Sequence, residues 1–86
     1  MSRALELVEV VTAWLVDENN ELDVRERSGR AQSLIEVYLT SDDFGRVIGR
    51  QGRTANAIRT LASLAGELEG RRVQVEFHEI EGVPRA

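Results

Sequence analysis

The sequence predicts an α+β domain in which helices cover one face of a three-stranded mixed sheet, in the order helix, strand, strand, helix, helix, strand. Apolar residues recur every three to four positions in some segments and every two in others, which indicates helices and strands respectively. Two helical segments separate the second strand from the third, which favours a parallel pair with a right-handed crossover. The chain has 86 residues, 42% hydrophobic and 30% charged, as expected for one globular domain.

The first half of the chain predicts a helix followed by a hairpin. Residues 2–16 carry a helical stripe, and Ser2 is the candidate N-cap. The stripe consists of Leu5, Val8, Thr12 and Leu15. Residues 22–27 and 33–40 alternate apolar and polar side chains, as half-buried strands do. A short turn containing Gly29 joins them, so we expect an antiparallel hairpin.

The second half predicts two helices and a last strand. A short helix starts at Ser41 or Asp42, and glycines within residues 49–52 interrupt it. Residues 53–68 are again helical. The side chains expected to face inward there are Ala55, Ile58, Leu61, Ala62 and Ala65. Alternation over residues 73–78 predicts the third strand. We expect residues 1–78 to form the domain and residues 79–86 a flexible tail.

The composition argues against several functional classes. Cysteine is absent, so neither a disulfide framework nor thiolate chemistry is expected. With a single histidine and dispersed acids, we expect no enzyme activity, no metal site and no cofactor. The sequence contains no apolar run long enough for a membrane span, and its first residues do not resemble a secretory signal. A cytoplasmic protein without membrane contact is expected.

Positive charge is concentrated in one part of an acidic chain. The 11 basic and 15 acidic residues give a net charge of −4. Residues 44–66 contain four arginines and no acid, a local charge of +4, so the remainder carries −8. These arginines are Arg46, Arg50, Arg53 and Arg59. A cationic patch on an acidic body indicates one directed anion site.

The stretch "GRVIGRQGRTANAIR", residues 45–59, contains this patch and three glycines. A Walker A loop and the dinucleotide fingerprint both require glycine where Val47 stands, and Arg53 replaces the phosphate-binding lysine. Nucleotide binding is therefore disfavoured. What remains is Gly-x-x-Gly, here Gly49-Arg50-Gln51-Gly52, between two helices.

This loop has two interpretations. Paired glycines let the backbone approach a phosphate chain, and the following helix adds free N–H groups and its positive dipole end. Arg50 and Arg53 supply charge, and Gln51 is suited to hydrogen-bond phosphate or sugar. The alternative is an ordinary connection between two helices. Local context favours the phosphate-binding interpretation without excluding the other.

The order of elements and the core "VIGRQGRTANAIRTL" resemble a KH domain of the bacterial type II arrangement, specifically the small KhpA-type RNA-binding proteins. The similarity covers about residues 2–78. It implies that residues 49–52 contact a nucleic-acid backbone, and that Val47, Ile48, Ala55 and Ile58 line a groove for unstacked bases. Two positions depart from the usual pattern: Arg50 stands where lysine is common, and Ala55 where broader KH families often have isoleucine.

The complete predicted RNA site follows from the loop, its flanking charges and this resemblance. It comprises Arg46, Val47, Ile48, Gly49, Arg50, Gln51, Gly52, Arg53, Ala55, Ile58 and Arg59. Arg59 is equally consistent with a solvated helix position. Arg71 and Arg72 are weaker candidates, and His78 is expected to be an ordinary surface residue.

The expected partner is single-stranded RNA, and the expected role is that of an RNA chaperone or post-transcriptional regulator. The resemblance also implies a homodimer or a heteromer with a KhpB (Jag)-type protein. Trp14 lies off the apolar stripe of the first helix, so it is either deeply buried or part of a partner surface. The acidic composition leaves open a protein–protein adaptor with weak or no RNA binding, and the same groove is compatible with single-stranded DNA.

Overall fold

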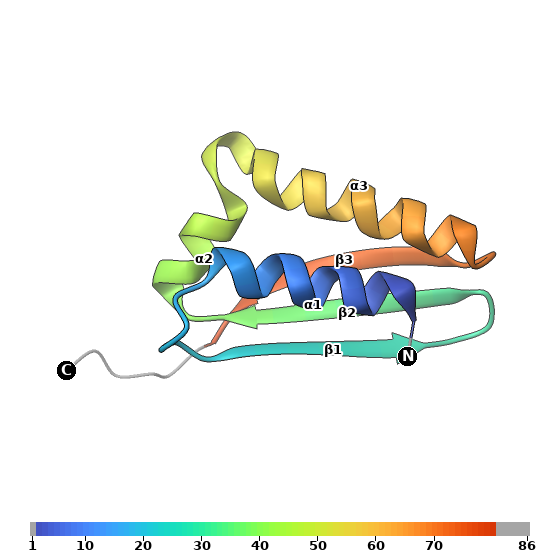
Figure 1. Cartoon of the computed structure of the whole chain (residues 1–86), viewed down its shortest axis with the longest axis horizontal. Helices are drawn as coiled ribbons and strands as arrows, with labels where there is room; N and C mark the ends of the chain where they lie inside the picture. Colours follow the sequence, from blue (N-terminus) through green and yellow to red (C-terminus); the bar gives the residue numbers. More distant parts are fainter. Residues whose placement is uncertain (1, 81–86) are drawn as a thin grey trace.

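The computed structural model describes residues 2–80 and contains the predicted two-layer arrangement. Three helices lie on one face of a three-stranded sheet (Figure 1). The elements are α1 (Arg3–Leu15), β1 (Leu22–Ser28), β2 (Gln32–Leu39), α2 (Ser41–Ile48), a 3-10 turn η1 (Arg50–Gly52), α3 (Arg53–Leu68) and β3 (Arg72–Glu79). The α+β class and the element order are confirmed.

The sheet has the order β1-β2-β3, with β2 in the centre. β1 and β2 form the predicted antiparallel hairpin, in which Leu22 pairs with Leu39. β2 and β3 are parallel, with Ile35 opposite Val75. The parallel pairing expected from the two helices between these strands is confirmed. β3 is consequently an edge strand, and its outer edge lies beside α3 (Figure 1).

The core lies between the sheet and the helices. The centre of the core consists of Ala4, Val8, Ile35, Val37, Leu39, Val47, Ile58, Ala62, Val73 and Val75. The predicted stripe of β2 is confirmed, since Ile35, Val37 and Leu39 are fully buried. One expectation is wrong: Leu61, expected to face inward, is 45% exposed. The buried face of α3 is made by Ala55, Ile58, Ala62 and Gly66.

The C-terminal end of α3 packs tightly onto β3 at Gly66. A Cβ on this residue would run into Val73 Cγ2 and lie 2.9 Å from the carbonyl oxygen of Arg71. The helix ends two residues later, and the N–H of Arg71 donates to the carbonyl of Gly66 at 2.8 Å. The absence of a side chain at Gly66 is therefore what lets α3 lie this close to the strand.

The expected end of the domain at residue 78 falls inside β3. The strand continues to Glu79, and the N–H of Ile80 donates to the carbonyl of Leu39 at 2.7 Å. Of the expected tail, residues 81–86 lie outside the described residues. In the part of the chain that is described, no helix has both the length and the apolar character needed to cross a bilayer.

Candidate nucleic-acid interface

The Gly-x-x-Gly segment forms a tight turn at the tip of the helical layer, where α2 meets α3 (Figure 1). Gly49 ends α2 and its N–H donates to the carbonyl of Gly45 at 3.1 Å. The chain then makes one 3-10 turn, closed by the N–H of Gly52 on the carbonyl of Gly49 at 3.3 Å. Gln51 has a left-handed backbone (φ 56°, ψ 24°), which is uncommon for a residue with a side chain.

Both glycines occupy backbone conformations that disfavour side chains, but not to the same degree. Gly49 (φ 71°, ψ −178°) lies in a region restricted almost entirely to glycine, and a Cβ there would lie 2.7 Å from Thr54 Oγ1. Gly52 (φ 71°, ψ 16°) is in the left-handed helical region, and the nearest atom to its Cβ would be Asn56 Nδ2 at 3.9 Å. The turn therefore depends more strictly on Gly49 than on Gly52.

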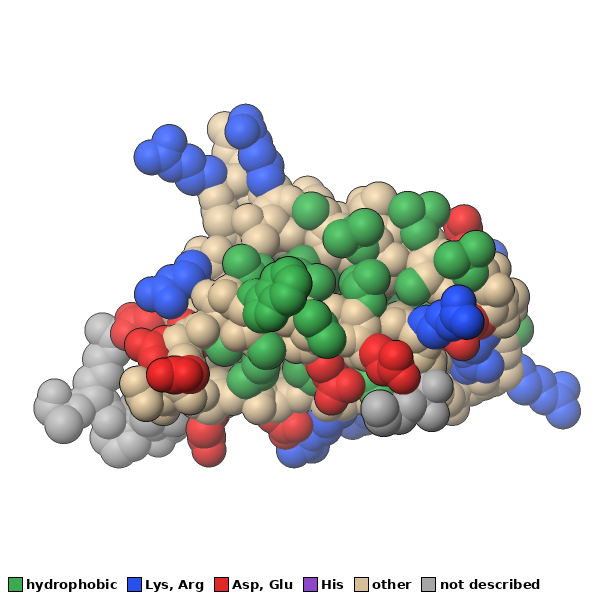
Figure 2. Space-filling model, viewed as in Figure 1, with side chains coloured by type: hydrophobic (Ala, Val, Ile, Leu, Met, Phe, Trp, Pro, Cys, Tyr) green, Lys and Arg blue, Asp and Glu red, His purple; other side chains and the backbone are tan. Residues whose placement is uncertain are grey.

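The N-terminus of α3 opens directly from this turn. Gly52 is its N-cap and provides no side-chain hydrogen bond, so N–H groups of the first turn keep their capacity to bind an anion. Arg50 and Arg53 are exposed beside it, and Arg53 Nη2 donates to Gln51 Oε1 at 3.3 Å. Figure 2 shows basic side chains projecting into solvent from this tip. Backbone donors, a helix dipole and guanidinium groups thus converge on one exposed place.

α2 is anchored by Asp43, a residue that the sequence analysis did not single out. Its carboxylate is fully buried and accepts from the Asp17 N–H at 3.2 Å and from Asn20 Nδ2 at 3.0 Å. Arg46 lies 3.6 Å from the same carboxylate and remains largely exposed. Asp43 thereby ties α2 to the loop after α1 and fixes the direction in which α2 delivers the turn. The spacing Thr40-x-x-Asp43, similar to a capping box, is the signal that the sequence offered.

A groove runs between α3 and the outer edge of β3. It has a volume of about 660 Å³. Its walls are Arg59, Thr60, Ser63, Leu64 and Glu67 from α3, and Val73, Gln74, Val75 and Glu76 from β3. The groove therefore lies along α3, the helix that follows the glycine turn. Polar side chains and the backbone edge of β3 border it.

Arg59 spans this groove in the structure. Its Nε donates to the carbonyl of Val75 at 3.2 Å, and its Nη1 donates to Asn56 Oδ1 at 2.9 Å. The guanidinium carbon lies 5.3 Å from the centre of the Phe77 ring, in cation–π range. Arg59 is therefore neither a simple solvated residue nor a member of the charged tip, because it connects α3 to the edge strand.

The four apolar residues predicted to line a base groove differ in accessibility. Val47, Ala55 and Ile58 are no more than 2% exposed and belong to the packing beneath the turn. Ile48 is half-buried beside Gly49. The structure thus brings ten of the eleven predicted residues together at one end of the helical layer, whereas Arg59 extends into the groove beside β3. The surface available to a ligand there is formed by the loop backbone, the arginines and Ile48.

The two weaker candidates, Arg71 and Arg72, differ in their contacts. Arg71 Nη2 donates to the carbonyls of Gly29 and Gln32, each at 2.9 Å, and so holds the β1–β2 hairpin against the turn before β3. Arg72 is exposed at the start of β3. Both lie at the end of the molecule opposite the glycine turn (Figure 1). Arg71 is accounted for by its structural contacts.

A second exposed feature is an apolar surface on α1 and α3. Figure 2 shows hydrophobic side chains gathered over these two helices. The large exposed members are Val10, Trp14, Leu61, Leu64 and Leu68, and we call them the apolar surface. Trp14 is 82% exposed and Leu68 79%. Of the two alternatives for Trp14, deep burial is therefore wrong, and exposed large apolar groups of this kind are typical of an interaction surface.

The fold and the loop define a class of protein: a three-stranded mixed sheet with the order α-β-β-α-α-β and a Gly-x-x-Gly turn between the last two helices is a type II KH domain. Residues 5–77 match the family described as "KhpA/KhpB, KH domain". The chain belongs to this family.

Curated relatives match over nearly their whole length. A protein of Caldanaerobacter subterraneus subsp. tengcongensis called "RNA-binding protein KhpA" is 44% identical over 72 residues, which cover 84% of this chain and 96% of the relative. A protein of the same name from Aquifex aeolicus is 37% identical over 79 residues, or 92% of this chain and 100% of the relative.

A crystal structure of Aquifex aeolicus Era bound to GDP.AlF4- contains a similar fold, with a TM-score of 0.58 and 22% identity. The match covers 90% of this chain and 30% of that longer chain. At this identity the similarity concerns the fold alone.

Proposed function

We propose that this protein binds single-stranded RNA through the turn at residues 49–52 and the adjoining groove. The observation that carries the proposal is the turn itself, in which two positive-φ glycines place the backbone and an N-terminus without a side-chain cap beside Arg50 and Arg53. A phosphodiester chain is the ligand that such donors fit best. The relatives named RNA-binding protein KhpA support RNA as the polymer.

In this proposal the backbone of the RNA follows the turn, and its bases lie toward the groove between α3 and β3. The distance from loop to groove is short, since Asn56 and Arg59 lie one to two helical turns beyond Gly52. Four nucleotides are the usual length held by this kind of domain. Ile48 and the Phe77 ring offer apolar contact to a base. Because Arg59 spans the groove, its side chain must move aside or contact the base when a base enters the groove.

The test is a charge reversal at the tip with a matched control. Arg50→Glu with Arg53→Glu changes the net charge by the same amount as Arg3→Glu with Arg30→Glu, whose positions lie away from the turn. We expect the first pair to weaken binding of a fluorescein-labelled single-stranded RNA about tenfold or more, with little effect of the second. The slope of log affinity against log salt should become shallower by about 1.4, or about 0.7 for each of the two phosphates that the arginines no longer neutralise.

Fluorescence anisotropy at several salt concentrations provides both quantities. Equal effects of the two pairs would show that binding follows net charge and does not use the turn. A single-stranded DNA of the same sequence, used as competitor, separates an RNA-specific site from a general single-strand site. Circular dichroism of each variant checks the fold.

We further propose that the protein acts as a dimer or together with a second KH protein, as a cytoplasmic RNA chaperone or regulator. The apolar surface on α1 and α3 supports this, because exposed large apolar groups are typical of an interaction surface, and of its five members only Leu64 also borders the groove. Pairing two weak sites raises the affinity for one RNA through effective concentration. A KhpB-type partner would use the same surface in place of a second copy.

The adaptor alternative keeps the fold but relies on protein contact. The net charge of −4 and the exposure of Trp14 favour it. Sedimentation velocity with and without RNA distinguishes the two functions. A tight oligomer with no measurable RNA affinity supports the adaptor, whereas complexes that depend on Arg50 and Arg53 support RNA binding.

A further inference from the structure

The face of the sheet turned away from the helices carries a group of polar side chains that RNA binding does not use. Side chains on this face come from alternate residues of each strand, among them Glu36 and Tyr38 of β2 and Glu76 and His78 of β3. Glu36 pairs with Glu76 in register, and Tyr38 with His78. Parallel strands about 4.8 Å apart thus bring two carboxylates and the chain's one imidazole together.

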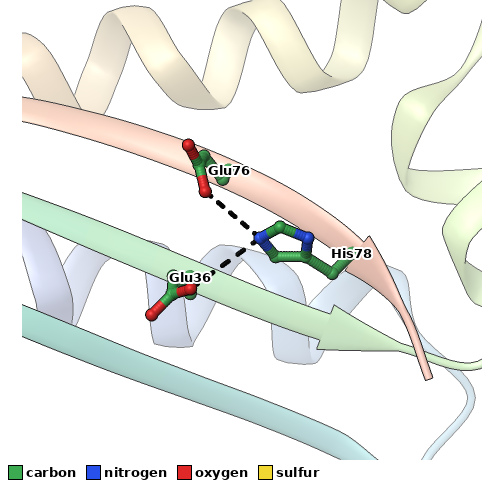
Figure 3. Close-up of side chains that lie close together, drawn as sticks. All are labelled: Glu36, Glu76 and His78. Carbon is green, nitrogen blue, oxygen red and sulfur yellow. Dashed lines mark hydrogen bonds and ion pairs between the residues drawn. The ribbon is translucent and has the colours of Figure 1, made fainter. Parts of the chain in front are cut away.

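Figure 3 shows the imidazole of His78 between the two carboxylates. His78 Nε2 lies 3.2 Å from Glu76 Oε1 and 3.9 Å from Glu36 Oε2. The three ligand atoms all lie within 4.8 Å of one another. A tetrahedral zinc ion about 2.1 Å from each ligand separates its ligand atoms by about 3.4 Å. The two distances from Nε2 lie on either side of this separation, and the two carboxylate ligand atoms are within 4.8 Å of each other.

The burial of Glu36 holds its carboxylate in place, with Oε1 paired to Arg27 and Oε2 directed toward His78. The residue is only 8% exposed, and its Oε1 accepts no hydrogen bond, although Arg27 Nε lies 3.0 Å away in an ion pair. A buried carboxylate is stable when its charge is well compensated. Arg27 approaches Oε1, whereas Oε2 is the oxygen directed toward His78.

Neighbouring groups hold these ligands in place, as outer contacts do in metal sites. The hydroxyl of Tyr38 donates to Glu36 Oε2 at 3.1 Å. The Tyr38 ring stacks on the imidazole of His78, with ring centres 5.1 Å apart and planes at 23°. One aromatic side chain therefore restrains both a carboxylate and the histidine.

We propose that Glu36, Glu76 and His78 form a binding site for a divalent transition-metal ion, with zinc as the ion of choice. An imidazole with two carboxylates suits zinc, whereas magnesium and calcium prefer all-oxygen sites. Three protein ligands leave a position for water. The ion joins β2 to β3 on the side of the sheet opposite the helices, so it leaves the glycine turn accessible.

The experiment uses the full chain without an affinity tag, because a polyhistidine tag would itself bind zinc. Zinc chloride is titrated in chelator-free buffer by calorimetry, and the imidazole signals of His78 are followed by NMR. Since this is the chain's one histidine, its signals report the site without ambiguity. We expect one ion per chain, a shift of these signals and a higher unfolding temperature.

Variants connect the binding to the proposed ligands. Glu76→Gln is a conservative change of a half-exposed side chain, so the fold should persist. It and Glu36→Gln should abolish stoichiometric binding, and Tyr38→Phe should weaken it by about tenfold. Glu67→Gln, on α3, is the matched control and should bind as the wild type does.

Two outcomes would overturn the proposal: no heat and no imidazole shift at excess zinc, or a shift that persists unchanged in Glu36→Gln and Glu76→Gln. The latter would mean that a lone surface histidine binds the ion. RNA affinity should be the same with and without zinc. The zinc result therefore does not depend on whether the charge reversal at Arg50 and Arg53 impairs RNA binding.

Discussion

Alanine substitutions at the two loop glycines should have unequal costs. At Gly49, alanine must adopt a conformation that costs about 1–3 kcal/mol, and its Cβ would lie 2.7 Å from Thr54 Oγ1 and 3.2 Å from Thr54 Cβ. Overpacking of this kind adds about 1–3 kcal/mol. At Gly52 the left-handed conformation costs about 1–2 kcal/mol, and the nearest contact is an ordinary one.

Gly49→Ala should therefore lower the free energy of unfolding by roughly 2–6 kcal/mol, whereas Gly52→Ala should lower it by about 1–2 kcal/mol. The total free energy of unfolding of a domain of this size is about 5–10 kcal/mol. Urea unfolding followed by circular dichroism measures the difference, provided that the denaturant slope is unchanged. If the turn rearranges locally instead, the same asymmetry should appear as a greater loss of RNA affinity in Gly49→Ala.

Thr54→Ala provides an internal check, because it removes the oxygen nearest to the new Cβ. The double variant Gly49→Ala with Thr54→Ala should recover about 1 kcal/mol relative to the sum of the single effects. The reasoning is refuted if the two glycine variants match in both stability and RNA affinity, or if Thr54→Ala brings no recovery.

Three other predictions concern separate parts of the molecule. Asp43→Ala should lower the free energy of unfolding by about 1–3 kcal/mol, because donors from Asp17 and Asn20 lose their buried acceptor; an unchanged urea midpoint would contradict this. Trp14→Glu should weaken the proposed self-association about thirtyfold in sedimentation velocity, as for an interface residue worth about 2 kcal/mol, whereas Ala13→Glu, at another exposed position of α1, should not. The hydrogen bond to Glu36 raises the pKa of Tyr38 above its ordinary value of 10.0, so absorbance at 295 nm should titrate at higher pH in the folded chain than in urea.

Because the pKa of Tyr38 differs between the folded and unfolded states, the stability of the protein depends on pH. A raised pKa in the folded state means that folding favours the protonated phenol. The contribution to stability is therefore complete below pH 10 and is lost as the pH rises through the folded-state pKa. Tyr38 is the single tyrosine, so one absorbance transition reports it. Coincident midpoints in buffer and in urea would refute the hydrogen bond.

Most of the fold was predictable because its elements are marked by local signals. The helix over residues 53–68 was predicted with the bounds that the structure has, since glycines precede it and a turn follows. The parallel pairing of β2 with β3 followed from the two helices between them. Burial on α3 was less predictable. Helical spacing allows Leu61 to face inward, and its exposure depends on how closely α3 approaches the sheet.

The candidate site was predictable in its charges and glycines but not in its contacts. The sequence places Arg50 and Arg53 next to the turn, and the structure keeps them exposed there. The contact of Arg59 with the Val75 carbonyl requires knowing which strand is the sheet edge and which of its peptide groups point outward. The grouping of Glu36 with His78 likewise depends on strand register, which pairs Glu36 with Glu76 and Tyr38 with His78, residues 40 positions apart.

Because α3 packs closely on β3 at Gly66, a small tilt of the helix there would move its opposite end. One end of this helix rests on β3 at Gly66, and the other carries the turn that ends at Gly52, about 21 Å away at 1.5 Å per residue. A tilt of about 5° at the resting point would displace the turn by about 2 Å over that length, more than half the length of a hydrogen bond. The position of the groups proposed to bind phosphate is thus set in part by a residue at the opposite end of α3. A methyl group added at Gly66 would act on the loop through the rigid helix.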